Sequence, residues 1–125
     1  MLSFLAYGLS ALVAAGITYI GIRFLVQPRV SAAGYGVPVT GERGAADAFF
    51  AVKGVRDIAS GLVLLAVLLT APAHVIGWVM LAFTVEVLGD MVIVLRWGGS
   101  KAHAFGIHGA TAVFMWLITV LLMLL

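Results

Sequence analysis

The residues best suited to chemistry in this sequence are charged side chains that lie within long apolar stretches. Glu86 and Asp90 are four residues apart inside the apolar segment 75–97, so a helix would place them one turn apart on one stripe. Two carboxyl groups this close in a low-dielectric setting do not readily both ionise, which favours an acid beside a carboxylate. Such a pair is suited to general acid–base catalysis, and we predict Asp90 or Glu86 as a proton donor.

Segment 46–70 supplies a second charged face. At about 100° per residue, a helix would bring Lys53, Arg56, Asp57 and Ser60 into one arc of roughly 100°. A cation on this face would hold one of the neighbouring acids as a carboxylate. We therefore expect Arg56 and Asp57 to act as an orienting pair.

The remaining candidate residues would complete a pocket. His108, in segment 103–125, shares a stripe with Thr111 and is expected to relay a proton. Tyr35 lies in a long Gly- and Pro-rich connection, and connections of this kind often cover a cavity. The predicted catalytic residues are Asp90, Glu86, Asp57, Arg56 and His108, and the predicted substrate-binding residues are Lys53, Tyr35, Tyr19, Trp97 and Thr111.

Each of these side chains also has a purely structural interpretation. Arg23 and Lys53 could extend to the membrane surface as anchors. Arg56 and Asp57 could hold helices in register without taking part in chemistry. Trp97 fits an aromatic belt at the membrane surface. The chemical hypothesis therefore concerns the set of residues and its convergence across several helices.

The sequence has no pattern typical of a metal or cofactor site, and we predict neither. It contains no Cys, which excludes disulfides, thiolate metal sites and iron–sulfur clusters. The Glu-x-x-His signature of di-iron helices and the Gly-rich phosphate loops are absent. Seven basic residues against five acidic ones leave a net charge of +2, too little for a nucleic-acid partner.

These side chains must be positioned by elements that lie in lipid. The 125 residues are 64% hydrophobic and 10% charged, with a mean hydropathy of +1.22, whereas soluble domains are about half apolar and a quarter charged. A membrane-spanning helix needs about 20 mostly apolar residues. Four segments of the sequence qualify, at about 2–26, 46–70, 75–97 and 103–125.

The connections between these segments predict the architecture. Residues 71–74 and 98–102 are short joints, which imply antiparallel neighbours, whereas 27–45 is a long Gly/Pro loop. Small residues along the first segment favour close helix packing, namely Gly8, Ala11, Ala15 and Gly16. We predict an all-α fold, a single membrane domain over 1–125 that forms an antiparallel four-helix transmembrane bundle.

The positive charges predict the orientation in the membrane. All seven Lys and Arg residues lie in or beside the first and third connections, and none lies near either terminus. The positive-inside rule then places both termini outside the cytoplasm. The charged side chains of the helices would share the cytoplasmic half of the bundle, where we expect a polar pocket.

Four short blocks follow one another through the apolar segments: Gly34-Tyr35-Gly36-Val37-Pro38, Lys53-Gly54-Val55-Arg56-Asp57, Gly89-Asp90-Met91 and His108-Gly109. With these blocks the sequence resembles an uncharacterised family of small four-helix integral membrane proteins, a domain of unknown function that is broadly similar to DoxX-like proteins. The resemblance implies the fold and, through the redox accessory roles of DoxX-type proteins, an accessory subunit. In chemistry alone, the tandem acids are similar to those of membrane isomerases and terpene cyclases that protonate lipophilic substrates.

The predicted function is binding of a lipophilic small molecule, taken from the inner leaflet of the lipid bilayer. Acid–base chemistry on this molecule would be cofactor-independent, as in an isomerase, a cyclase or an epoxide-opening hydrolase. Whether the protein is an enzyme stays open. The alternatives are a proton-coupled small-molecule transporter, acting as a homodimer with Glu86 or Asp90 as the coupling carboxyl, and an accessory subunit of a membrane redox complex.

Overall fold

The computed structural model describes all 125 residues, and the chain is helical almost throughout, with no strand. The prediction of an all-α fold is therefore confirmed. Three of the four predicted segments match single helices to within two residues at each end. In chain order the elements are α1 (Leu2–Val26), α2 (Pro28–Tyr35), α3 (Asp47–Thr70), α4 (Ala73–Arg96), α5 (Lys101–His103), the π-helical segment η1 (Ala104–Gly109) and α6 (Ala110–Met123).

Three helical stretches are long and apolar enough to cross a bilayer: Leu2–Val26, Ala73–Arg96 and Lys101–Met123. These stretches indicate a multi-pass membrane protein in a lipid environment. The prediction was four such segments. α3 has the necessary length of 24 residues, but the charged residues in its N-terminal half separate it from the other three.

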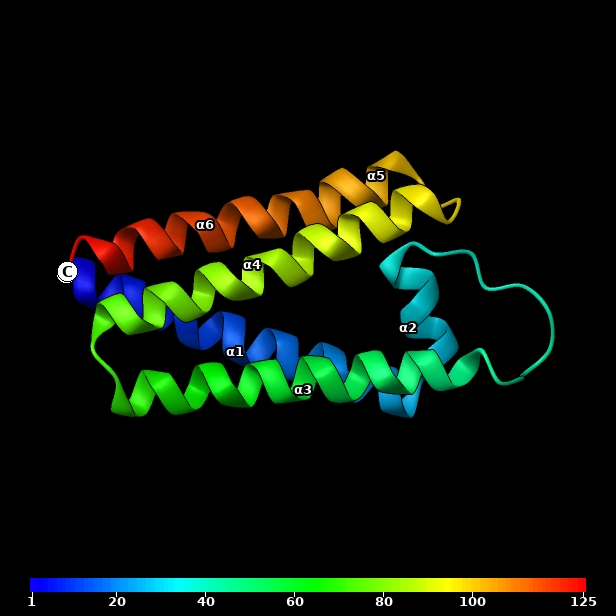
Figure 1. Cartoon of the computed structure of the whole chain (residues 1–125), viewed down its shortest axis with the longest axis horizontal. Coiled ribbons are helices and arrows are strands. Elements are labelled where there is room, and N and C mark those ends of the chain that lie inside the picture. Colours follow the sequence, from blue (N-terminus) through cyan, green and yellow to red (C-terminus); the bar gives the residue numbers. More distant parts are fainter.

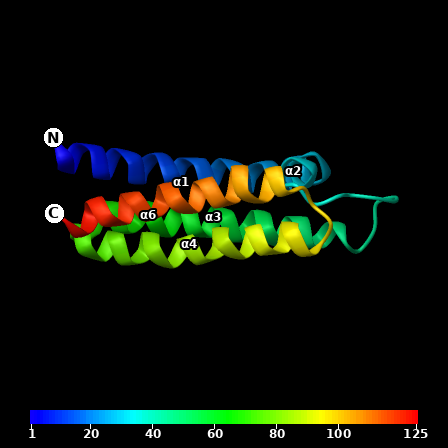
Figure 2. The ribbon, with the colours of Figure 1, turned by 90° about the horizontal axis from the view of Figure 1, so that it is seen from above.

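The long helices run alongside one another, and both termini lie at the same end of the molecule (Figures 1 and 2). The short helix α2 lies across their direction at the opposite end, together with the long connection to α3 (Figure 1). α1 packs mainly against α3, and α4 packs mainly against α6. The contacts between these two pairs are sparser, which leaves room for a cavity between α1 and α6.

Glycines bring the backbones of α1 and α3 into close contact. A Cβ atom added at Gly54 would lie 2.8 Å from the carbonyl oxygen of Gly21, and one at Gly61 would lie 2.8 Å from that of Ala14. The prediction of close packing through Gly8 and Gly16 was wrong, because nothing lies within 4 Å of a Cβ atom at either position. Small residues do set the distance between these helices, but on another face of α1.

The buried apolar core lies toward the end that carries the termini. Its residues come from α1, α3, α4 and α6, and are Ala6, Ala14, Leu64, Ile76, Met80, Met115, Ile118 and Leu122. The buried hydroxyls of Ser10, Thr84 and Thr119 donate to the carbonyl four residues earlier in their own helices. These hydroxyls therefore need no partner from another helix in the apolar half.

The predicted loop 27–45 contains a short helix, α2, that was not predicted from the sequence. Pro28 occupies the first turn of α2, where its missing N–H costs no hydrogen bond. Gly36 ends this helix in the left-handed conformation with φ of 105°, which glycine adopts without strain. The rest of the connection is held by Arg29, whose guanidinium bonds to the carboxylate of Asp47 at 3.1 Å and to the carbonyl oxygen of Gly41 at 2.8 Å.

The predicted helix 103–125 also differs from a regular α-helix. Between α5 and α6, residues Ala104–Gly109 form a π-helical segment. Such segments are rare and are frequently found at functional sites. In this chain the segment contains His108, which is 7% exposed.

Candidate functional site

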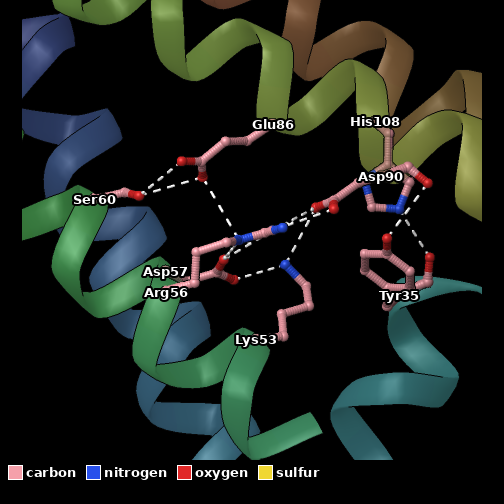
Figure 3. A network of polar contacts seen from close by, with 8 residues as sticks. All are labelled: Tyr35, Lys53, Arg56, Asp57, Ser60, Glu86, Asp90 and His108. Atoms are coloured by element: carbon pink, nitrogen blue, oxygen red, sulfur yellow. Dashed lines mark hydrogen bonds and ion pairs between the residues drawn. The ribbon is translucent and has the colours of Figure 1, made fainter. Parts of the chain in front are cut away.

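Four charged side chains from α3 and α4 form a closed network, here called the tetrad (Figure 3). Lys53 Nζ lies 2.8 Å from Asp57 Oδ2 and 3.2 Å from Asp90 Oδ2. Arg56 Nη2 lies 3.2 Å from Asp57 Oδ1 and 3.2 Å from Asp90 Oδ1. Each cation thus contacts both carboxylates, and the two positive charges balance the two negative charges.

The carboxylates of the tetrad are the most buried charges in the protein. The side chain of Asp57 is 2% exposed and that of Asp90 is 9% exposed. A carboxylate removed from water is costly unless it is paired and hydrogen-bonded, and the tetrad satisfies both conditions. Because Asp90 comes from α4 and the other three residues come from α3, the tetrad links two helices that otherwise contact each other sparsely.

Glu86 is the acid that remains outside the tetrad. It lies one turn before Asp90 on α4 and accepts a hydrogen bond from Ser60 Oγ, with 3.1 Å between Oγ and Oε1. The nearest cation is Arg56, whose Nε lies 3.7 Å from Glu86 Oε2. The Glu86 side chain is 26% exposed, more than either carboxylate of the tetrad. Glu86 is thus the least tightly paired acid of the cluster.

His108 and Tyr35 join η1 to α2. The Nε2 atom of His108 lies 2.9 Å from the carbonyl oxygen of Tyr35, and since a carbonyl oxygen only accepts, Nε2 is the protonated donor. The two rings pack edge to face with 4.6 Å between their centroids. This contact gives His108 a backbone partner from α2, and its ring bonds to none of the carboxyl groups of the cluster. The role of His108 as a proton relay stays a prediction.

Tyr35 covers the tetrad from the side of α2 (Figure 3). Its phenol donates a long hydrogen bond of 3.4 Å to the backbone oxygen of Asp90, and Lys53 Nζ lies 5.0 Å from the centre of its ring. Burial raises the pKa of the Tyr35 phenol above its usual value, and the Asp90 carboxylate raises it further. The phenol therefore stays a neutral donor throughout the physiological pH range.

A cavity of about 450 Å³ lies between α1, α2, α3, α4 and the η1–α6 stretch, with the tetrad and Glu86 at its polar end. This volume is within the range of roughly 300–1,000 Å³ that is usual for sites of small-molecule ligands. Most of its wall is apolar, and several wall residues face outward between α1 and α6. Leu12 is 62% exposed, Tyr19 60% and Phe114 38%, so the cavity opens at the side of the molecule.

Nine of the ten predicted site residues line this cavity. The exception is Trp97, which does not line it and is 72% exposed. Trp97 directly follows the last residue of α4, and its role in substrate binding stays a prediction. The other nine are Asp90, Glu86, Asp57, Arg56, His108, Lys53, Tyr35, Tyr19 and Thr111.

The cavity also contains residues that the sequence did not mark as site residues. Arg23 shares a stripe with Tyr19 in the sequence, but its position near the end of a helix favoured a surface anchor. Ser60 lies on the predicted charged face and bonds to Glu86, but it does not itself line the cavity. Ser31 and Phe24 carry no signal in the sequence that points to a cavity. No group of three or more His, Asp or Glu residues is arranged to hold a metal ion.

Comparison with known proteins identifies one family. The family model described as Domain of unknown function (DUF4267) matches residues 14–123, a stretch that contains the tetrad, Glu86 and His108. No curated protein and no solved structure matches the chain.

Proposed function

The chain belongs to the DUF4267 family over most of its length, as expected for an uncharacterised family, and we propose that it binds a lipophilic small molecule in the cavity and exchanges protons with it through Glu86. The observation that carries the proposal is the cavity itself, which combines an apolar wall with a charged end among membrane-capable helices. Ionisable residues inside a membrane domain mark functional sites more often than not.

We include α3 as a fourth membrane-spanning helix, so that α1, α3, α4 and the α5–α6 stretch form an antiparallel transmembrane bundle. Two observations support this arrangement. α3 runs beside the other long helices, and both termini lie at one end of the molecule (Figure 2). The basic residues Arg29, Arg43, Arg96 and Lys101 lie in connections or at helix ends on the other side, which the positive-inside rule assigns to the cytoplasm. The termini are then extracytoplasmic.

The lateral opening between α1 and α6 gives a ligand a direct path from the bilayer. A lipophile already dissolved in the inner leaflet would enter between these helices without crossing water. The similarity to DoxX-like proteins stays an interpretation, and it supports an accessory subunit as the alternative function.

Glu86 is the preferred proton donor because its carboxyl group is less tightly held by cations than that of Asp90, which leaves it able to bond to a ligand in the cavity. The oxygens of Asp90 are already held by Lys53 and Arg56. In an isomerisation, the Glu86 carboxyl would donate its proton to one carbon of a double bond, and the carboxylate would accept a proton from a neighbouring carbon. Such a cycle consumes no cofactor. Cyclisation and epoxide opening would start from the same protonation.

Filling the cavity is expected to expel the ligand. Gly16 lines the cavity and has nothing within 4 Å of an added Cβ atom, so Gly16→Phe should occupy the wall without displacing the backbone. Protein purified from its native membranes in an uncharged detergent should carry one lipophile at a constant ratio, and Gly16→Phe should lose it, as measured by native mass spectrometry.

The matched control is Gly8→Phe on the same helix. Gly8 also has nothing within 4 Å of an added Cβ atom, but it does not line the cavity. This variant should retain the lipophile. Equal retention by both variants, or equal loss, would contradict binding in the cavity.

Proton exchange through Glu86 is expected to leave an isotopic trace. When wild-type protein is incubated in D2O with a total lipid extract of its membranes, the bound lipophile should acquire deuterium at a carbon position. Glu86→Gln keeps the size of the side chain and an oxygen that accepts from Ser60, so it should fold and bind but transfer no deuterium. Mass spectrometry of the extracted lipophile measures the label.

The control for this experiment is Glu42→Gln, the same substitution at an exposed acid that lies outside the cavity. It should transfer deuterium as the wild type does. Binding without any labelling by the wild type would rule out the acid–base chemistry. A transporter would then be tested by uptake of the same lipophile into proteoliposomes under a pH gradient.

A further inference from the structure

Arg23 is the one cation in the cavity that has no acidic partner. Three basic residues line the cavity, and Lys53 and Arg56 both belong to the tetrad. Arg23, in the last turn of α1, forms no ion pair. Its Nη1 atom makes a long hydrogen bond of 3.4 Å to the hydroxyl of Tyr19, and its Nε atom is buried without any hydrogen-bond partner.

Ser31, on α2, also has a buried polar atom without a hydrogen-bond partner. Its Oγ atom is buried and has no hydrogen-bond partner, and the residue lines the same cavity as Arg23. These two side chains are the only ones in the protein with a buried nitrogen or oxygen that lacks a partner. Buried polar atoms in folded proteins are almost always hydrogen-bonded, so two unpartnered donors in one cavity point to a missing acceptor.

The charge of the cavity indicates the nature of this acceptor. The two cations of the tetrad are paired with Asp57 and Asp90, and Arg56 also lies 3.7 Å from Glu86 Oε2. Arg23 is therefore the one cation of the cavity that is paired with no carboxylate, and an anion beside it would be favoured in a low-dielectric setting. A guanidinium and a hydroxyl are typical donors to carboxylate and phosphate oxygens.

The shape of the cavity fits a ligand with a polar head and an apolar chain. The lining residues of α1 run from Leu12 to Phe24, a distance of roughly 18 Å along a helix that rises 1.5 Å per residue. Arg23 lies at the end of this stretch that is near α2, and Leu12 lies at the other end. A lipid-like molecule of the inner leaflet has the same orientation, with its head at the membrane surface and its chain toward the bilayer centre.

We infer that the ligand is an anionic amphiphile, whose carboxylate or phosphate head is bound by Arg23 and Ser31 and whose chain lies along the apolar wall. This inference rests on the proposed function, since it specifies the ligand of the same cavity. Arg23 is then a residue that selects the ligand by its charge, in addition to any role at the membrane surface.

The test compares three probes with the same alkyl chain, which are lauric acid, monolauryl phosphate and lauryl alcohol. Their equilibrium binding to the purified full-length protein is measured in micelles of an uncharged detergent. The wild type should bind at least one anionic probe about tenfold more tightly than the alcohol, as expected for one charge-assisted contact. The better anionic probe identifies a carboxylate or a phosphate as the natural head.

Arg23→Gln should remove the preference for the anionic probe and leave the affinity for the alcohol within about twofold of the wild type. Ser31→Ala should reduce the preference in part. The matched control is Arg96→Gln, which removes an exposed positive charge near the end of α4, outside the cavity, and should keep the full preference.

Three results would overturn the inference. Equal affinity of the wild type for the acid, the phosphate and the alcohol would show that the cavity does not select an anion, while cavity binding itself would stand. Weaker binding of all three probes to Arg23→Gln would assign Arg23 a general structural role. No binding of any probe to the wild type would exclude such amphiphiles, and the Gly16→Phe comparison would then decide separately whether the cavity binds a different lipophile.

Discussion

Replacing Gly61 with valine is expected to prevent the normal packing of α1 against α3. A Cβ atom at this position would lie 2.8 Å from the carbonyl oxygen of Ala14 and would overlap the hydroxyl oxygen of Thr18. The carbonyl belongs to the backbone of α1, so it cannot rotate aside as a flexible side chain could. The helices would have to separate along their main contact, which we expect to cost about 3 kcal/mol or more, at or beyond the upper end of the usual range for overpacked cores.

The measurement is equilibrium unfolding of the purified protein in mixed micelles. The matched control is Gly89→Val on α4, since Gly89 is also within a helix but has nothing within 4 Å of an added Cβ atom. We expect the control to change the free energy of unfolding by less than about 1 kcal/mol, the range of helix propensity. If the two variants lose the same stability, close packing at Gly61 is not what holds α1 to α3.

Replacing Asp57 with asparagine is expected to destabilise the protein by about 3–5 kcal/mol, because it removes one charge from a buried network and leaves the others unbalanced. Asparagine has nearly the same size, so the loss would not come from a cavity. Lys53 and Arg56 would then share the single carboxylate of Asp90, and the amide nitrogen of the new side chain could not accept from either cation.

The double variant Lys53→Met with Asp57→Asn tests this explanation. It removes one positive and one negative charge and leaves the pair of Arg56 and Asp90, which are 3.2 Å apart. The double variant should therefore be more stable than Asp57→Asn alone, which a double-mutant cycle would report as a positive coupling. If the two losses simply add, or if Asp57→Asn costs less than about 1 kcal/mol, the charges of the tetrad do not depend on one another.

The tetrad was largely predictable because its residues obey helical periodicity. Lys53, Arg56 and Asp57 must share a face of any helix that contains them, and the cost of charge in lipid directs that face toward the interior. Their convergence with Asp90 then requires only that two helices lie side by side. The sequence could not distinguish Glu86 from Asp90, because the difference lies in which acid the guanidinium of Arg56 reaches.

The glycine contacts between α1 and α3 and the contact of His108 with α2 could not be predicted from the sequence, and the reasons differ. α1 is apolar on all sides, so its periodicity does not tell which small residues meet a neighbour, and Gly16 was an equally good choice as Gly21. The partner of His108 is a backbone oxygen of Tyr35, on a short helix within a connection rich in Gly and Pro. Local residue types specify neither the direction of such a helix nor the neighbour that it meets.

The π-helical segment fixes how α6 is turned relative to α5. Its hydrogen bonds span five residues instead of four, so it contains one residue more than an α-helix needs for the same turn. If the same six residues formed a regular α-helix, one side of the segment would be rotated by about 100° relative to the other. His108 could then not face α2 while Met115 and Leu122 face the core. Deleting one residue of the segment should instead leave the core-facing side of α6 in place and change only the contacts made within the segment itself.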